Sequence, residues 1–453
     1  MNLRTTLIIA VLLAGLGAYA YFVEYKGGAK KEEAKEKEKT LLEIKREDVK
    51  EIRLDWPEQP IRIAATGKDI WQITSPLQSR ADQATVDRIL GAFEKLKYQQ
   101  IIEQQPKNLS GYELDQPKHT IHLVSKKSER TIQIGAKNPV ESVYYVRLNN
   151  DPRVYTVDST VGDLSSITLL DLRDKKLTDF STDKVQSLNL QTANLDLQFE
   201  KQGDVWKMKK PVESPASESE VTSLLSSLET LQASKFIDQP SPDLTTYGLN
   251  PPAATLELSL EKGLHQKIIF GKKEGEELYC RVEGNPSIAT VTDSFTTTFD
   301  KKLEDWREKK LVVFNRFDTD EARIKSDGKE YVFQKGAEEK WNQTSPVKGE
   351  VDAEKVQDLL EKLETVEIAK YGTESSVSTP GAMDVVLSLK DWQDKVTKKH
   401  LTFGPVKDNL QQVKNDDYAT IVYAQPALQQ ELLKALSEIK PKPPVPPAAK
   451  PKK

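Results

Sequence analysis

An apolar pattern that occurs three times at intervals of 135 residues constrains the fold of this chain more than any other feature. Within each copy the apolar positions are spaced by three, one, three and three residues, which places their side chains on one face of an α-helix. The interval is too long for a solenoid, whose repeats span roughly 20 to 50 residues, and it matches the size of a domain. We therefore expect three related domains in a row, each with a helix built on one of these sets: Val86, Ile89, Leu90, Phe93, Leu96; Val221, Leu224, Leu225, Leu228, Leu231; and Val356, Leu359, Leu360, Leu363, Val366.

A six-residue frame with tryptophan first and proline last precedes each predicted helix, at Trp71 to Pro76, Trp206 to Pro211 and Trp341 to Pro346. An apolar-alternating stretch and a glycine come before each tryptophan, a pattern typical of strand, turn and strand. Proline cannot donate to a sheet, so each proline should end the second arm of the hairpin. The tryptophans are expected to pack in a shared type of interior, and stacking on a ligand is the alternative.

The start of each predicted helix carries a residue that can cap it. Asp82, Ser217 and Asp352 stand four residues before the first apolar position. There a side-chain oxygen can accept a hydrogen bond from a first-turn amide, a contribution of about 1 kcal/mol. Ser217 and Glu220 also have the spacing of a capping box.

Strand-like segments follow each predicted helix. After a joining segment that contains Tyr112 or Tyr247, alternating residues indicate strands that end at Ile134, Phe270 and Phe403, each followed by glycine, and the third joining segment, around Pro380, is degenerate. The expected fold class is α+β: an N-terminal transmembrane helix, then three tandem homologous domains, each a mostly antiparallel sheet with one long packed helix. The predicted boundaries are a membrane anchor at 1–26, a charged linker at 27–40, repeat domains at 41–177, 178–312 and 313–440, and a Pro/Lys-rich tail at 441–453.

The N-terminus differs from the rest of the chain because Leu7 to Val23 includes no charged residue. As a helix this segment would be about 25 Å long, at the short end of what spans a bilayer. We interpret it as a single-pass anchor in the inner (cytoplasmic) membrane; a cleaved signal peptide is the alternative, because Ala18 to Ala20 forms a small-x-small site. Lysines after the segment would keep the domains in the cytoplasm by the positive-inside rule. They alternate with glutamates, however, and we expect the domains on the periplasmic (extracytoplasmic) side.

Residues that carry most enzyme and metal chemistry are scarce. Cys280 is the only cysteine, and its place in an alternating strand indicates a packed residue rather than a nucleophile. His119 and His122, two of four histidines, share a strand at spacing three and so point to opposite faces. No nucleophile elbow, zinc-protease motif or phosphate-binding glycine loop occurs. We expect no enzyme activity, no metal and no cofactor. A net charge of −4 without a basic aromatic stripe also argues against nucleic acid.

A polar segment recurs where one repeat ends and the next begins. Leu172-Arg173-Asp174-Lys175-Lys176-Leu177 returns as Trp306-Arg307-Glu308-Lys309-Lys310-Leu311, whereas the third repeat runs into the proline tail. We expect these segments to act as interdomain hinges whose arginines pair with carboxylates of the next repeat, and a ligand-binding patch is the alternative. The hinge residues are Arg173, Asp174, Lys175, Arg307, Glu308 and Lys309.

A second polar pattern pairs a tyrosine with an arginine two residues later, as Tyr145 with Arg147 and Tyr279 with Arg281. At that spacing both side chains of a pair share one face of a strand. The four residues either form a face that contacts a partner or belong to the solvent side of a half-buried sheet.

With these motifs in place, the chain resembles the bacterial family catalogued as domain of unknown function 4340. The resemblance covers residues 41 to about 440 and implies a single-pass envelope protein, often associated with ABC exporters of the gliding-motility type. It implies no catalytic residues. It rests on the Trp-to-Pro frame, the capped helix, Tyr247-Gly248-Leu249, Phe270-Gly271, Tyr145-Val146-Arg147 and the Leu172 to Leu177 segment, while Glu113 stands where the family has glycine.

Together these features predict a membrane-anchored, extracytoplasmic, non-enzymatic interaction or scaffold protein, an auxiliary component of an ABC-type transport complex. Its expected partners are the membrane and a transporter permease or related envelope subunits. The alternative is a cell-wall or glycan-binding envelope module, which would present a cluster of exposed aromatic side chains within one domain.

Overall fold

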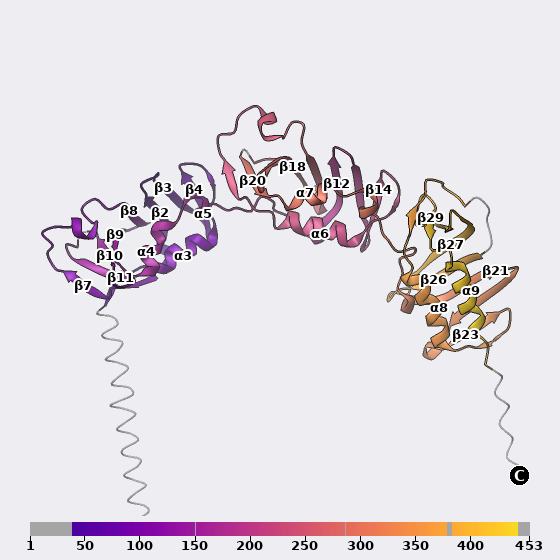
Figure 1. The fold of residues 1–453 in the computed structure, drawn as a ribbon. Coiled ribbons are helices and arrows are strands. Elements are labelled where there is room, and N and C mark those ends of the chain that lie inside the picture. Colours follow the sequence, from indigo (N-terminus) through magenta and orange to yellow (C-terminus); the bar gives the residue numbers. More distant parts are fainter. Residues whose placement is uncertain (1–38, 150, 286, 378–382, 443–453) are drawn as a thin grey trace, which may run out of the picture. The chain divides into compact units, whose positions relative to one another are not determined.

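The computed structural model describes residues 39–442 except 150, 286 and 378–382. The predicted anchor at Leu7 to Val23, nearly all of the charged linker and Pro380 lie outside the described residues. Within the described part, no helix combines the length and the apolar character needed to cross a membrane. The chain divides into two units, of which the first, up to Lys175, contains repeat 1 and the second, from Lys176, contains repeats 2 and 3 (Figure 1).

Each repeat forms one nine-stranded sheet with an α-helix packed on it, which confirms the predicted α+β class. The strand pairs are antiparallel throughout the described residues. In every repeat the chain starts at the middle of the sheet and runs outward to one edge. The helix then carries it to the opposite edge, and it returns to the middle and runs outward again.

Repeat 1 has the sheet order β5-β4-β3-β2-β8-β9-β10-β11-β7, and β1 pairs separately with β6. Its principal helix is α3, Gln83–Glu94, and two short helices follow the sheet. The other elements are β1 Thr40–Glu43, β2 Val49–Asp55, β3 Ile61–Gly67, β4 Ile70–Ser75, β5 Ser79–Arg80, β6 Lys95–Lys97, β7 Gln100–Glu103, β8 His119–Ser125, β9 Glu129–Lys137, β10 Val143–Leu148, β11 Val154–Asp158, α4 Ser159–Gly162 and α5 Leu169–Leu172.

Repeat 2 has the order β15-β14-β13-β12-β17-β18-β19-β20-β16, position for position the topology of repeat 1. Its principal helix is α6, Glu218–Glu229. The other elements are β12 Val185–Thr192, β13 Asp196–Gln202, β14 Val205–Lys210, β15 Ser214–Pro215, β16 Lys235–Ile237, β17 Ala254–Leu260, β18 His265–Glu274, β19 Glu277–Val282, β20 Ile288–Thr292 and α7 Ser294–Phe299.

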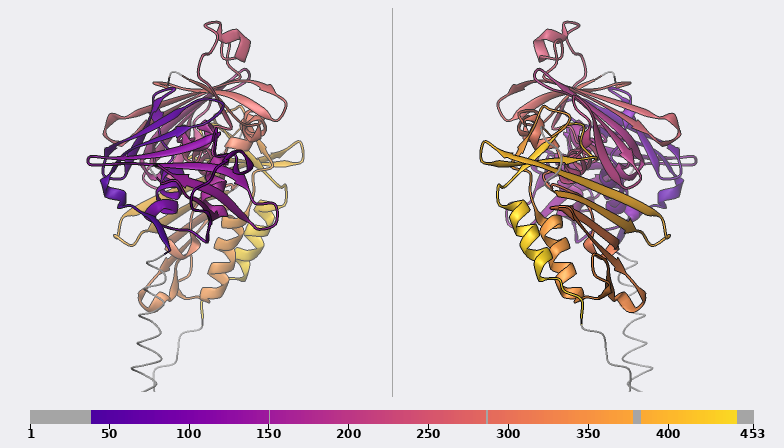
Figure 2. Two further views of the ribbon diagram at one scale, coloured as in Figure 1. Left: turned by 90° about the vertical axis from the view of Figure 1, so that its left-hand side faces the viewer. Right: turned by 90° about the vertical axis from the view of Figure 1, so that its right-hand side faces the viewer.

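Repeat 3 has the order β24-β23-β22-β21-β26-β27-β28-β29-β25 and differs from the others in a second long helix. This helix, α9 (Leu428–Glu438), was not expected from the sequence, and Figure 2 shows it beside α8 (Ala353–Thr365) in both views. It forms because Leu428, Leu432 and Leu436 are buried on one face. The strands are β21 Thr319–Ser326, β22 Lys329–Lys335, β23 Trp341–Ser345, β24 Gly349–Glu350, β25 Lys370–Tyr371, β26 Met383–Lys390, β27 Val396–Lys407, β28 Leu410–Asn415 and β29 Val422–Ala424.

The three predicted helix faces are buried in three separate hydrophobic cores, as expected. Burying each such side chain stabilises the fold by roughly 1.5 to 3 kcal/mol before ordering costs. Trp71, Trp206 and Trp341 are also buried, so packing rather than ligand stacking explains their repetition. The strand that carries each tryptophan ends directly before the frame's proline, as predicted.

Two of the three predicted caps are present. Asp82 accepts a hydrogen bond from the Thr85 amide and Asp352 accepts one from the Glu354 amide. The expected capping box at Ser217 is wrong: its hydroxyl meets Ser219, and Glu220 pairs with Lys301. The backbone amide of Ser217 already donates to the carbonyl oxygen of Trp306, 2.9 Å away, so it has no need of the Glu220 side chain.

The predicted strand ends at Ile134, Phe270 and Phe403 are wrong, because β9, β18 and β27 each continue through the following glycine. In β9 and β18 this glycine has a steric cause. A Cβ at Gly135 would overlap the backbone carbonyl of Tyr112 in the joining segment and lie 2.9 Å from Leu114 Cγ. A Cβ at Gly271 would overlap the carbonyl of Tyr247 in the same way. The joining segment can therefore pack on the sheet only where the strand has no side chain.

Candidate functional site at the junction between repeats

The linker between repeats 2 and 3 is bonded to both repeats. On the side of repeat 2, the Glu308 amide donates to the Pro215 carbonyl at 3.1 Å. On the side of repeat 3, the Leu311 amide donates to the Val366 carbonyl at 2.9 Å, and the Ile368 amide donates to the Lys309 carbonyl at 2.7 Å. A single extended segment thus closes one repeat and opens the next, so the predicted hinge is held by strand-like pairing on each side.

Arg307 is the buried cation of this linker, with only 3% of its surface exposed. Its guanidinium carbon lies 3.8 Å from the centroid of the Tyr371 ring in β25. The aromatic ring stands where the sequence predicts a carboxylate of the next repeat, so that prediction is wrong for Arg307. Burial lowers the pKa of Arg307, and its Nε and Nη2 atoms have no hydrogen-bond partner among the described residues. A desolvated cation–π contact of about 2 kcal/mol offsets part of the cost of this burial.

Two tyrosine hydroxyls of repeat 3 bind the backbone of the same linker. Tyr371 donates to the Glu308 carbonyl at 2.7 Å, and Tyr418 donates to the Lys310 carbonyl at 2.9 Å. The side-chain amide of Asn415 donates to the Leu311 carbonyl at 2.7 Å. Burial raises the pKa of Tyr371 to about 12 and also raises that of Tyr418, so both remain hydrogen-bond donors at neutral pH. Sequence reasoning missed Tyr418 and Asn415, which repeats 1 and 2 do not carry at equivalent places.

The loop that carries Tyr418, residues 415–420, also touches repeat 2 directly. The Ala419 amide donates to the Glu213 carbonyl at 2.9 Å. Beneath the loop, Lys414 donates to the Tyr418 carbonyl and Lys399 pairs with Asp417 at 2.7 Å. The junction therefore consists of a linker held in place by one loop, which is itself fixed by side chains of β27 and β28.

His400 in β27 supports the same loop. Its Nδ1 lies 3.1 Å from an Asp416 oxygen, and its Nε2 lies 2.9 Å from an Asp384 oxygen. Partial burial acts to lower the pKa of His400, but the hydrogen bonds to Asp416 and Asp384 outweigh it, and the pKa lies above its ordinary value. Only the protonated imidazole can donate to both carboxylates at once.

In the first unit, the start of the equivalent linker is fixed to its own repeat. The Asp174 amide donates to the Arg80 carbonyl at 3.0 Å, and the Arg173 Nε donates to the Ser79 hydroxyl at 3.2 Å. Lys175 lies 3.6 Å from Asp171. In repeat 3, the amide of Lys442 donates to the Glu350 carbonyl at 2.7 Å and so takes the place of Glu308. Every repeat therefore closes with the same backbone bond.

Three of the four residues of the predicted partner face have partners inside their own repeats. The ring of Tyr145 packs at 4.9 Å against Tyr112, and that of Tyr279 packs at 5.2 Å against Tyr247, in both cases on the joining segment. Arg147 donates to the Asp151 carbonyl at 3.2 Å, and the fourth residue, Arg281, is half-buried. Contact of this face with another protein stays a prediction.

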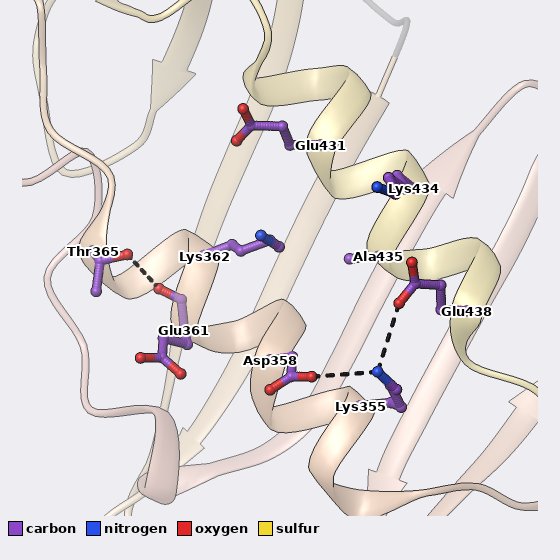
Figure 3. A pocket seen from close by; sticks show the side chains of 9 residues that line it. All are labelled: Lys355, Asp358, Glu361, Lys362, Thr365, Glu431, Lys434, Ala435 and Glu438. Carbon is purple, nitrogen blue, oxygen red and sulfur yellow. Dashed lines mark hydrogen bonds and ion pairs between the residues drawn. The ribbon is translucent and has the colours of Figure 1, made fainter.

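A polar groove with a volume of about 640 Å³ runs between α8 and α9 of repeat 3 (Figure 3). Lys355 lies at one end, 3.7 Å from Asp358 and 3.6 Å from Glu438. Three lysines and four carboxylates line the groove, so its charges largely cancel.

Within the described residues no group of histidine, cysteine and carboxylate side chains is arranged to hold a metal ion. Cys280 is buried, and burial raises the pKa of its thiol, which makes it a poor nucleophile.

Comparison with known proteins gives one informative match. The model of the family described as domain of unknown function (DUF4340) matches residues 71–211 and again residues 206–384. No curated protein matches the chain in sequence. Among solved structures, a DNA polymerase sliding clamp from Pseudomonas aeruginosa with ligand is 8% identical, with a TM-score of 0.15, over 85% of this chain and 94% of that chain. The DNA polymerase III subunit beta of the same organism is 10% identical, also with a TM-score of 0.15, over 83% and 93%. TM-scores this low carry no argument about fold or function.

Proposed function

This chain belongs to the family described as domain of unknown function (DUF4340), and from that premise we propose that it is a non-enzymatic scaffold. It would be anchored by its N-terminal apolar segment in the inner membrane, with its repeats on the extracytoplasmic side. There it would serve as an auxiliary component of an ABC-type transport complex. The resemblance to the family supplies the association with transporters.

The observation that carries the scaffold proposal is the junction between repeats 2 and 3. A linker that buries an arginine and binds both neighbouring repeats through its backbone resists bending far better than a polar tether. The same sheet is used three times, and each copy is built around a well-packed core. Such construction suits a protein that spans a distance or holds a partner at a set position.

Mild cross-linking in native membranes, followed by identification of what is recovered with the protein, tests the proposal. Recovery of a transporter permease is expected. A photo-reactive residue at Arg281, on the predicted partner face, should capture it more efficiently than one at Lys262, on the exposed β17–β18 turn. Recovery of murein alone would reject the transport role and favour the alternative.

One observation favours that alternative, a glycan-binding envelope module. Trp392, on the turn between β26 and β27, is 89% exposed, unlike the repeated tryptophans. The Asp391 carboxylate accepts hydrogen bonds from the amides of Gln393 and Lys395, both at 2.9 Å, which holds the turn in shape. Phe317, 62% exposed, precedes β21, whose first residue pairs with Leu389 just before this turn. Two exposed aromatic rings thus belong to the same end of one sheet.

Tryptophan fluorescence distinguishes the two functions. If the alternative holds, soluble murein fragments should shift the emission of the wild-type chain and protect it from iodide, and Trp392→Ala should abolish both effects. Trp206→Phe, which removes a buried tryptophan, serves as the matched control and should leave them unchanged. A wild-type spectrum that does not respond to the fragments would leave the scaffold as the sole candidate.

A further inference from the structure

A polar pocket with a volume of about 240 Å³ lies on the sheet of repeat 2, across β12, β13, β14 and β17. Leu188, Leu190 and Leu197 alternate along the strands with its lining residues and are buried in the core with the leucines of α6. Neighbouring residues of a strand point to opposite faces of its sheet. The pocket therefore lies on the face of the sheet that is turned away from α6 (Figure 1).

The central strand of repeat 2 differs from its counterparts at a position that lines this pocket. By strand register three residues correspond to one another: Asn189 in β12, Arg53 in β2 and Arg323 in β21. Arg53 pairs with Glu51 at 3.0 Å, and Arg323 pairs with Glu321 at 3.1 Å. Ser187 stands at the place of these glutamates in repeat 2. The ion pair found here in the other two repeats therefore cannot form in repeat 2.

The polar side chains around Asn189 are left without partners in the protein. The Asn189 Oδ1 atom is buried and accepts no hydrogen bond from a described residue. The amides of Gln191 and Gln198 and the hydroxyl of Thr255 also line the pocket, and none of them bonds to another side chain among the described residues. Each of these groups can both donate and accept. Because an unpaired buried acceptor is unfavourable, a hydrogen-bond donor on a ligand is favoured at this place.

The charged residues that line the pocket nearly balance one another. Glu257 is paired with Lys267 at 2.6 Å. Asp196 and Lys210 are exposed, carry opposite charges and form no ion pair within the described part of the chain. This balance favours a neutral ligand over an anion or a cation. The volume is below the roughly 300 to 1,000 Å³ of sites for drug-sized molecules, which indicates a smaller ligand.

We propose that this pocket binds a neutral, hydroxyl-rich ligand of the size of a single sugar ring. Sugar hydroxyls both donate and accept hydrogen bonds, as the amides and the hydroxyl of the pocket do, and the Asp196 carboxylate can accept from two neighbouring hydroxyls at once. No aromatic ring of the described residues lines the pocket to stack on the ligand, so we expect a weak affinity, with a Kd on the order of 1 mM. The inference goes beyond the scaffold function and does not depend on it.

Saturation-transfer NMR of the full-length chain tests the proposal, with methyl glucoside and N-acetylglucosamine as the probes. The wild-type chain should transfer saturation to at least one of them. Ser187→Glu/Asn189→Arg introduces the ion pair of repeats 1 and 3, so it should fold, fill the pocket and weaken binding by about tenfold or more. Gln198→Ala should also weaken binding. Gln202→Ala, on the exposed end of the same strand and outside the pocket, is the matched control and should not. Trp392→Ala should likewise leave binding unchanged.

Failure of both sugars to receive saturation would overturn the proposal. Unchanged binding in Ser187→Glu/Asn189→Arg would do the same, and if that variant does not fold, unchanged binding in Gln198→Ala decides. Loss of binding in Trp392→Ala would place the sugar on repeat 3 and overturn the assignment to this pocket. Saturation of glycerol phosphate or spermidine in place of the sugars would overturn the choice of a neutral ligand. Recovery of a permease by cross-linking, or its absence, affects only the scaffold function.

Discussion

Replacing Tyr418 by phenylalanine should loosen the junction between repeats 2 and 3 without unfolding either repeat. The Tyr418 hydroxyl lies 2.9 Å from the Lys310 carbonyl and 3.3 Å from the Glu308 carbonyl. The hydroxyl has one proton and so donates one strong hydrogen bond, to the nearer Lys310 carbonyl. The Glu308 carbonyl keeps its bond from Tyr371 in the variant, whereas the Lys310 carbonyl loses its side-chain donor.

The size of the effect follows from that single bond. A buried hydrogen bond contributes about 1 kcal/mol, and leaving an acceptor unpaired costs about 1 to 3 kcal/mol. Because the carbonyl lies at a junction that water can reach once it opens, we expect about 1 to 2 kcal/mol. That energy corresponds to a rise of roughly 5- to 30-fold in the open population of the junction.

Hydrogen exchange of the full chain, read by mass spectrometry, measures that population. Peptides from residues 305–312 and 414–421 should exchange faster in Tyr418→Phe by this factor, while peptides from α6 should not change. Tyr423→Phe is the matched control, because Tyr423 is a buried tyrosine of the same sheet whose ring contact with Lys370 does not involve the hydroxyl. The reasoning would be refuted if the junction peptides of Tyr418→Phe exchanged at the wild-type rate. It would also be refuted if the α6 peptides were accelerated by the same factor.

Three further predictions concern stability. Gly135→Ala should destabilise repeat 1 by about 1 to 3 kcal/mol through overpacking against Tyr112, whereas Gly111→Ala, where a Cβ meets open space, should cost nothing measurable; calorimetry of both variants decides. Glu113→Gly should stabilise repeat 1 by about 1 kcal/mol, because Glu113 has φ 53° in the left-handed region; an unchanged midpoint in urea would contradict this. The pKa of His400 is raised in the folded state, so its contribution is fully present below the unfolded value of about 6.5 and is lost as pH rises through the folded value. The melting temperature of the wild type should therefore fall relative to that of His400→Gln as the pH rises above about 6.5, and parallel curves would exclude the effect.

The parts of the fold that were predictable are those whose signals are local. Helical spacing of apolar residues located α3, α6 and α8, and proline after the tryptophan strand located the end of each hairpin. The helix α9 has the same kind of signal, with leucines at 428, 432 and 436, but it lies outside the 135-residue pattern and was overlooked. The short strands β5, β15 and β24 have two residues each, too few for any periodicity.

The partners of the candidate site could not be predicted, because they come from distant parts of the chain. Arg307 was recognised as a linker residue, but its contact with Tyr371 depends on where β25 lies in the sheet. Ser217 has the right spacing for a capping box, yet the carbonyl of Trp306 already occupies its amide. Tyr418 could not be recognised from the sequence, because a single tyrosine in a loop belongs to no periodic or repeated motif.

For this protein, repetition and periodicity by themselves determined that three similar sheets form, each with a helix whose apolar face is buried, because those properties depend on side chains within a few turns or strands of one another. Only the tertiary structure decided which groups meet at the ends of the repeats. There a backbone carbonyl, an aromatic ring or the space left by a glycine selects the partner, and such contacts join residues that the sequence separates by tens to more than one hundred positions.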